Sequence, residues 1–359
     1  MVLAGVSVQQ HESNPATWNL ENLSCSEALC CFSSQMLAQE TRISMPEKFT
    51  NRTLITEFLL MGFPDDKLLQ RLYATLFIII YLAALMGNLL IIVLTTVDHH
   101  LQLPMYFFLK NLSLLDICYI SVTVPKSIVN SLTNSHSISF LGCASQIFLV
   151  VFCSGTEFAL LIVMSYDRYA AICHPLHYEV IMNKRSCMQM VVASWFSGCV
   201  YGSIHVAGTF SVSFCGSNIV HQFFCDIPSL LIHTCYGENN LEYAFIIASC
   251  SFDFLCFILM IVSYVHIFST VLKIPSAQGR FKSFSTCMPH ITVVTLFLSS
   301  GFIAYLSSTS KSSSSRNIFT SVLYSLIPPT LNPVIYSLRN RDMKAALVKM
   351  FGGITASKT

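Results

Sequence analysis

The stretch Met164–Tyr178 reads MSYDRYAAICHPLHY and joins the end of a long apolar run to the start of a basic loop. Asp167 and Arg168 stand side by side in it, so two opposite charges lie where an apolar helix would leave a membrane. The guanidinium can pair with Asp167 or reach a neighbouring helix, and can thereby hold a bundle closed or release it. The alternative is a charged cap that snorkels to the lipid headgroups, and the Asp-Arg-Tyr triplet alone does not exclude it.

The composition indicates a membrane protein. Of the 359 residues, 53% are hydrophobic and 11% are charged, which is about half the charged fraction of an average soluble protein. The net charge of +2 is too small to indicate a nucleic-acid partner. Met1–Gln10 lacks the charged start and apolar core of a cleaved signal peptide, so the first membrane helix is expected to direct insertion.

Seven apolar segments follow, each long enough for about 20 helical residues to cross roughly 30 Å of hydrocarbon. Because a backbone in lipid must satisfy its own hydrogen bonds, these segments predict helices. We expect an all-α membrane protein, a bundle of seven transmembrane helices followed by a short amphipathic C-terminal helix. The expected spans are 70–96, 104–127, 141–167, 188–210, 243–271, 284–306 and 318–337.

The chain is expected to have four parts. Residues 1–44 are polar and irregular and form an N-terminal extension, and 45–69 form an extracellular N-terminus. The helix bundle covers 70–337, and 338–359 form a cytoplasmic amphipathic helix and tail. The apolar residues of this tail share one helical face, which favours a helix lying along the inner leaflet. They are Met343, Ala346, Leu347, Met350 and Phe351.

The distribution of Lys and Arg predicts the orientation. The long loop 211–242 contains no Lys or Arg, whereas the connections on the other side of the bundle carry many. Basic loops stay in the cytoplasm, so the N-terminus is expected outside and the C-terminus inside. Asn22 and Asn51 each begin an N-glycosylation sequon ahead of the first span, and both are candidate sites.

Several motifs together resemble those of odorant receptors, the largest family of rhodopsin-like G-protein-coupled receptors. Met164–Tyr178 is similar to the family's M-A-x-D-R-Y-x-A-I-C-x-P-L-x-Y, with Ser165 in place of a frequent Ala. PPTLNPVIYSLRN at 328–340 and KSFSTCMPH at 282–290 are also family strings. The resemblance extends over Phe58–Lys349 and implies the tetrapod-type branch, which detects volatile molecules at the plasma membrane. It also implies a stimulatory, olfactory-type G protein that raises cyclic AMP.

The resemblance assigns an activation switch to the cytoplasmic end of the bundle. Pro333 removes a backbone hydrogen bond, which gives the last helix a weak point that can change shape, or only a static kink. The sixth helix is expected to swing outward and open a groove for the G protein; for Lys282, a membrane-edge anchor is the alternative. The switch and coupling residues are Asp167, Arg168, Tyr169, Tyr264, Lys282, His290, Asn332, Pro333 and Tyr336.

A ligand pocket is implied among the outer halves of the helices, beneath the loop 211–242. Most of its expected residues are apolar or small, which suits a volatile molecule held by burial at about 25 cal/mol per Å². Each can equally serve helix packing. Asp253 is the exception, because it either receives an amine or hydroxyl or is a protonated acid bonded to a neighbouring helix. The expected lining is Val151, Ser154, Gly155, Ala248, Ser249, Phe252, Asp253, Phe302, Tyr305 and Val322.

The ligand preference of relatives does not transfer directly, because one family motif is altered. The family frequently has Phe-Tyr-Gly midway along the sixth helix, where this chain reads Phe297-Leu298-Ser299. The tyrosine hydroxyl is therefore missing. The fold is not affected by this change.

Two disulfides are also implied by the resemblance, Cys143–Cys225 and Cys215–Cys235. The pairing comes from the family, since four cysteines allow three connectivities. Most other cysteines lie in apolar runs, where they act as small hydrophobes.

The acids Asp116 and Glu157 lie in apolar runs, where an isolated charge costs several kcal/mol. They must therefore be paired, protonated or bound to a cation. With Asn332 and Ser154 they could hold a sodium ion, as in related receptors; the alternative is that one or both are protonated. No other cofactor is expected.

Other classes of protein fit the sequence less well. The chain has no phosphate-binding glycine loop, metal-binding His pair or Ser-His-Asp arrangement, so no enzyme activity is expected. Intramembrane carboxylates also occur in ion-coupled transporters, but no internal repeat is visible. A rhodopsin-like receptor for another small ligand is the nearer alternative. The expected partners are an odorant, a heterotrimeric G protein and membrane lipid.

Overall fold

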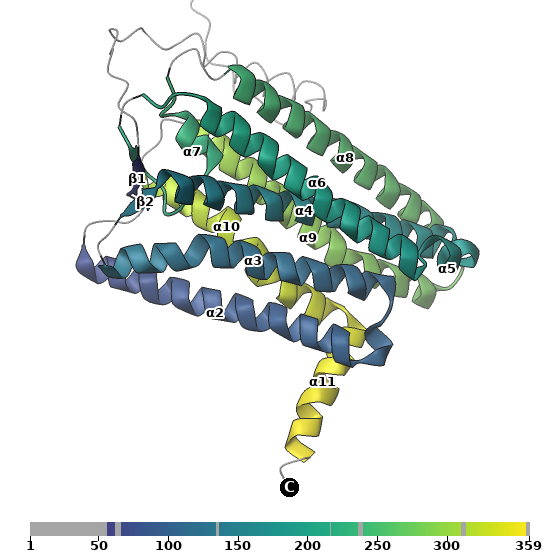
Figure 1. Cartoon of the computed structure of the whole chain (residues 1–359). Coiled ribbons are helices and arrows are strands. Elements are labelled where there is room, and N and C mark those ends of the chain that lie inside the picture. Colours follow the sequence, from purple (N-terminus) through teal and green to yellow (C-terminus); the bar gives the residue numbers. More distant parts are fainter. Residues whose placement is uncertain are drawn as a thin grey trace, which may run out of the picture. The chain divides into compact units, whose positions relative to one another are not determined.

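The computed structural model describes residues 56–61, 66–133, 136–215, 217–235, 240–309 and 314–356. The expected extension 1–44 and the sequons at Asn22 and Asn51 lie outside these residues. Within these described ranges, seven long helices run side by side (Figure 1). They are α2 (Lys67–Val97), α3 (Pro104–Thr133), α4 (Phe140–Cys173), α6 (Lys184–Ser211), α8 (Asn240–Leu272), α9 (Ala277–Thr309) and α10 (Ser314–Arg339).

Short elements lie at the two ends of these helices (Figure 1). At one end are α7 (Ile227–Leu231) and the strands β1 (Glu57–Leu60), β2 (Ser137–Ser139) and β3 (Ile219–Val220). The other end carries the 3-10 turns η2 (His99–Leu101) and η3 (Pro175–His177), with α5 (Tyr178–Ile181) and α11 (Arg341–Ala356).

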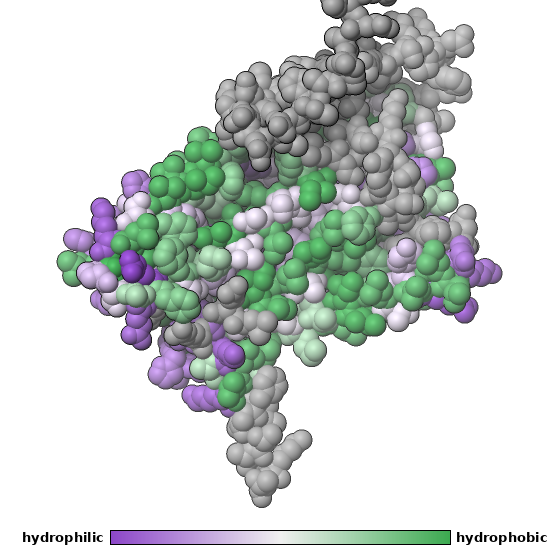
Figure 2. Space-filling view, turned by 180° about the vertical axis from the view of Figure 1, so that it is seen from behind, coloured by the Kyte–Doolittle hydropathy of each residue, from purple (hydrophilic) through white to green (hydrophobic). Residues whose placement is uncertain are grey.

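Six of the described helices are long and apolar enough to cross a membrane, which confirms the expected spans for α2, α3, α4, α6, α8 and α9. Their outer faces carry large exposed apolar side chains such as Leu82, Phe196 and Val265. Apolar residues cover the middle of the face in Figure 2, and hydrophilic residues gather at its two ends. This pattern suits a bundle whose middle is surrounded by lipid.

The segment expected as the seventh span forms α10. It is the least apolar of the seven long helices, and Pro328, Pro329 and Pro333 lie inside it. Pro333 lacks the N–H that would bond the carbonyl oxygen of Pro329, four residues earlier. Asn88 of α2 fills this gap, because its Nδ2 donates to the Pro329 oxygen at 2.9 Å.

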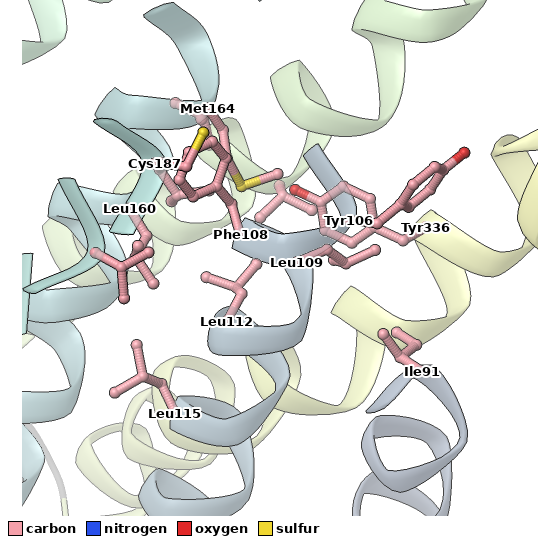
Figure 3. Close-up of a cluster of buried hydrophobic side chains, with 14 of the residues drawn as sticks. Ile91, Tyr106, Phe108, Leu109, Leu112, Leu115, Leu160, Met164, Cys187 and Tyr336 are labelled. Carbon is pink, nitrogen blue, oxygen red and sulfur yellow. The ribbon is translucent and has the colours of Figure 1, made fainter. Parts of the chain in front are cut away.

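A large buried cluster contains side chains from all seven long helices and from α11, and Figure 3 shows part of it. Phe108, Leu112 and Leu160 are fully enclosed there, and Tyr336 reaches the cluster from α10. Lipid is as apolar as these side chains, so burial between helices gains van der Waals packing rather than transfer from water. Shape therefore decides which helix faces meet.

Small residues allow α4 and α6 to approach closely. A Cβ added to Gly198 would lie 1.9 Å from Thr156 Oγ1 and 2.8 Å from the Phe152 carbonyl oxygen, and one added to Gly202 would lie 3.1 Å from the Phe148 oxygen. These glycines are one helical turn apart and form the contact side of α6. Gly-x-x-x-Gly spacing is typical of close helix contacts in membranes.

A small sheet at the α7 end was not expected from the sequence. β1 lies in the middle, antiparallel to β2 and parallel to β3. Phe58 and Leu60 alternate inward and are fully buried. The segment before the first helix is therefore tied to two loops that follow it far along the chain.

Candidate functional site

The loop between α6 and α8 covers one end of the bundle and is fixed at several points. Its two disulfides are Cys143–Cys225, which joins it to the first turn of α4, and Cys215–Cys235 within the loop. These are the pairs that the family resemblance implies. The Cys225 N–H also donates to Gln146 Oε1 at 2.9 Å.

Further contacts hold this loop to α3 and α10. Ser127 of α3 donates to the Phe223 carbonyl oxygen at 2.8 Å, and Ser321 of α10 donates to Gln222 Oε1. Tyr324 of α10 donates from its hydroxyl to Asp226 Oδ2 at 2.7 Å. The loop is therefore anchored to three helices.

A cavity of about 160 Å³ lies under this cover, between α3, α4, α9 and α10. Its wall is mostly apolar and aromatic, with Asp226 in the covering loop and Glu157 deeper on α4. Asp226 follows Cys225, which is bonded to Cys143 at the start of α4. Glu157 lies 14 residues after Cys143, or about 21 Å further along the helix, so Asp226 and Glu157 lie at different depths. The lining residues are Tyr119, Ile147, Val150, Val151, Ser154, Glu157, Cys225, Asp226, Ile227, Pro228, Phe297, Ser300, Gly301, Tyr324, Pro328 and Pro329.

Of the expected pocket residues whose side chains the structure describes, Val151 and Ser154 line this cavity. Phe252 and Phe302 are 61% and 58% exposed and lie outside it, and Ala248 is also exposed. Val322 packs on a separate apolar cluster. The side chain of Tyr305 lies outside the described part of the chain.

The other expected pocket residues lie at the contact between α4, α6 and α8. A Cβ on Gly155 would come within 3.0 Å of the Tyr201 ring. Tyr201 donates from its hydroxyl to Asp253 Oδ2 at 3.4 Å, and His205 Nε2 lies 3.1 Å from Ser249 Oγ. Asp253 thus bonds Tyr201 of a neighbouring helix and lies outside the cavity.

Deeper in the bundle, one amide joins the two buried acids. Asn332 Nδ2 donates to Asp116 at 3.1 and 3.2 Å and to Glu157 Oε1 at 3.2 Å. All three side chains are buried, and Asn332 Oδ1 has no hydrogen-bond partner. Ser154 instead donates to the Val150 carbonyl oxygen at 2.9 Å.

The chemistry of this group fits a hard cation. Two carboxylates and an unpartnered amide oxygen are the oxygen donors that such ions prefer. Two carboxylates this close also need a proton or a cation between them. The described residues contain no cluster of three or more His, Cys, Asp or Glu side chains, so a transition-metal site has no such basis there.

At the opposite end, Arg168 is paired within its own helix. Its Nε donates to Asp167 Oδ2 at 2.9 Å, and a second guanidinium nitrogen donates to the same oxygen. Tyr178 of α5 donates to Asp167 Oδ1 at 2.7 Å. Burial and the nearby Asp167 carboxylate raise the pKa of Tyr178, so the phenol stays a donor.

Tyr264 and His290 link α8, α9 and α4 near this pair. The Tyr264 hydroxyl lies 2.5 Å from His290 Nδ1, and His290 Nε2 lies 3.0 Å from the Leu161 carbonyl oxygen. Because Nε2 faces a carbonyl, it carries the proton, and Nδ1 accepts from the tyrosine. Arg168, His290 and Tyr336 line one narrow gap.

The other switch residues have separate surroundings. The Tyr336 hydroxyl is buried without a partner. The Tyr169 hydroxyl lies 3.3 Å from His174 Nε2. Pro333 packs closely against Gly87, where a Cβ added to the glycine would lie 3.0 Å from the proline Cβ. The side chain of Lys282 lies outside the described part of the chain.

Comparison with known proteins identifies the family. The profile described as "Olfactory receptor" matches residues 77–353, most of the chain. The chain belongs to the olfactory receptor family. Its members are odorant receptors coupled to G proteins, so this chain is a multi-pass protein of the plasma membrane rather than a member of an enzyme family.

Individual relatives cover nearly the same region. Human "Olfactory receptor 14A16" is 56% identical over 308 residues, which are 86% of this chain and 99% of the relative. Human "Olfactory receptor 14L1" is 55% identical over 302 residues, or 84% of this chain and 93% of the relative. Mouse "Olfactory receptor 1E16" is 43% identical over 301 residues, covering 84% and 96%.

Several cavity residues were missed by the sequence analysis. Asp226 is absent from the expected pocket lining, although its position next to a disulfide cysteine was a usable signal. Tyr119, Tyr324 and Pro328 have no such signal, because only the packing of α3 and α10 against α4 turns them inward.

Proposed function

We propose that this olfactory receptor binds a small, mostly hydrophobic volatile molecule in the cavity beneath the loop between α6 and α8. One observation carries the proposal: the cavity has a mostly apolar wall and a cover that two disulfides and three helices hold in place. Its volume of about 160 Å³ is below the roughly 300–1,000 Å³ of pockets for drug-sized ligands. A volatile of few atoms suits this size.

Binding is proposed to shift a two-state bundle toward an open cytoplasmic face. α4 supports this coupling, because it carries Val151 and Glu157 at the cavity and Arg168 at the other end. A ligand can move this equilibrium only by binding the open form more tightly. The proposed partner is a stimulatory, olfactory-type G protein that raises cyclic AMP.

The proposed topology has seven spans, with α10 as the seventh, the N-terminus outside and the C-terminus in the cytoplasm. The basic connections beside α5 and α11 support this orientation. α11 is proposed to lie on the inner leaflet. Its Met343 and Ala346 are buried against the bundle, and Lys349 lies 3.9 Å from Asp98.

A sodium ion is proposed as an accessory ligand of Asp116 and Glu157. The unpartnered Oδ1 of Asn332 supports this, since it would supply a third oxygen. The ion would neutralise the two carboxylates and stabilise one state of the bundle.

The ligand site is tested with a variant that fills the cavity. Val151→Phe is expected to raise the odorant concentration for half-maximal cyclic AMP by about tenfold or more, because the added ring occupies the space of the ligand. Val265→Phe, on the exposed face of α8, is the matched control. Equal responses of both variants, at equal surface levels, would place the ligand elsewhere.

A further inference from the structure

Asp226 is a buried acid in the cover of the cavity. It is 7% exposed and lines the cavity together with Cys225, Ile227 and Pro228. The disulfide of Cys225 and the bond from its N–H to Gln146 hold the backbone immediately before it. The carboxylate therefore has a fixed position at the outer end of the cavity.

The hydrogen-bond partners of Asp226 are all neutral. Oδ1 accepts from the Ser229 N–H at 3.2 Å, and Oδ2 accepts from the Tyr324 hydroxyl at 2.7 Å. No ion pair joins it to a Lys, Arg or His of the described residues. Burial raises the pKa of Asp226, and the hydrogen bonds from Ser229 and Tyr324 offset this only in part.

The surroundings of Asp226 suit an organic cation. Tyr119, Phe297 and Tyr324 contribute aromatic rings to the wall, and such rings attract ammonium groups through their faces. Ile147, Val150 and other apolar residues continue the wall inward, where a hydrocarbon part can be buried. At the inner end, Glu157 shares the Asn332 amide with Asp116 and belongs to that deeper group, whereas Asp226 is the acid at the outer end of the cavity.

We propose that Asp226 determines the specificity of the cavity and selects small protonated amines over alcohols of the same size and shape. The proposal rests on the proposed function, because it assumes that the odorant occupies this cavity. The ammonium group would lie between the Asp226 carboxylate and the Tyr119 and Tyr324 rings, with the hydrocarbon part pointing toward Phe297.

A purely structural role for Asp226 is the competing explanation. In that role the side chain caps the short helix α7 and ties the loop to α10. Asp226→Asn distinguishes the structural role from the binding of amines by charge. The amide oxygen of asparagine can still accept a hydrogen bond from Ser229 or Tyr324, but the side chain carries no charge. A structural role predicts equal effects on all ligands, whereas a charge role predicts an effect on amines alone.

The experiment uses the full chain in cells with a cyclic AMP readout and surface staining. The probes are pentylamine with 1-pentanol, and cyclohexylamine with cyclohexanol, beside a panel of neutral esters and terpenes. The wild type is expected to respond to an amine at a concentration at least tenfold below that for its alcohol. Asp226→Asn is expected to raise the half-maximal amine concentration at least tenfold and that of the alcohol less than threefold.

Asp253→Asn is the matched control, because Asp253 is an acid of the apolar helix α8 that lies outside the cavity and bonds Tyr201. It is expected to keep the amine preference. If Asp253→Asn removes that preference and Asp226→Asn does not, the proposal is overturned. The same holds if Asp226→Asn shifts amines and alcohols equally.

Two further results keep the test decisive. If Asp226→Asn does not reach the cell surface, Tyr324→Phe is tested instead. It removes the hydrogen bond to Asp226 but keeps the aromatic ring at 324 and the charge at 226. A retained preference for amines supports the proposal, and a lost preference overturns it. If the wild type answers neutral odorants but no amine, this proposal fails while the proposed function stands. Silence to every probe would count against both.

Discussion

The side chain of Asn88 in α2 donates a 2.9 Å hydrogen bond to the carbonyl oxygen of Pro329 in α10. That oxygen lacks its usual helical partner because Pro333 has no N–H. The same Asn88 Nδ2 donates to the Ala84 carbonyl oxygen at 3.0 Å. One amide therefore joins two helices at the point where α10 is weakened, and it satisfies the buried carbonyl that Pro333 leaves free.

Asn88→Ala is expected to destabilise the bundle by about 1 kcal/mol or more, because it leaves the Pro329 oxygen buried without a donor. Surface level and thermal stability in detergent measure the effect. Asn111→Ala is the control, since among the described residues the Asn111 side chain bonds the Phe107 carbonyl oxygen of its own helix and no other helix. Equal loss in both variants would show that the contact between α2 and α10 contributes nothing.

Gly198→Ala is expected to separate α4 from α6. The new methyl would lie 1.9 Å from Thr156 Oγ1 and 2.8 Å from the Phe152 carbonyl oxygen, and only the side chain can move away. Overpacking of this kind typically costs about 1–3 kcal/mol. The measurement is the melting temperature of the purified receptor; Gly301→Ala, whose added Cβ meets nothing within 4 Å, should leave it unchanged. Thr156→Ala in the same chain should restore part of the loss.

The long helices were predicted well from the sequence, because a membrane span is identified from the length and hydrophobicity of a single segment. It also located Arg168 beside Asp167, since adjacent charges inside a motif are visible in one dimension. Asn88 shows the limit. Its role depends on a carbonyl oxygen 241 positions away that Pro333 leaves free, and no local pattern connects the two.

The candidate site was likewise predicted only in part. Val151 and Ser154 follow from family position, because α4 packs against α3, α6, α8 and α9 at the centre of the bundle. Phe252 and Phe302 point outward, since a small rotation of α8 or α9 exchanges a cavity-facing side chain for a lipid-facing one. Both faces of such helices are apolar, so composition cannot fix the rotation.

Asp167→Asn is expected to raise basal cyclic AMP, because it removes the charge that holds Arg168 within its own helix. Tyr178→Phe removes only one neutral hydrogen bond to Asp167 and should give a smaller increase. Basal signalling is compared at equal surface levels. A larger increase from Tyr178→Phe than from Asp167→Asn would contradict control by the ion pair.

Glu157→Gln is expected to remove the dependence of signalling on external sodium. The substitution keeps an oxygen near Asn332 Nδ2 but removes one of the two charges that would bind the ion. Odorant responses of wild type and variant are measured with sodium replaced by N-methylglucamine at constant ionic strength. A salt dependence in the wild type that Glu157→Gln abolishes and Asp253→Asn preserves supports the ion. The same salt response in all three proteins would show that the carboxylates of Asp116 and Glu157 are instead held by a proton.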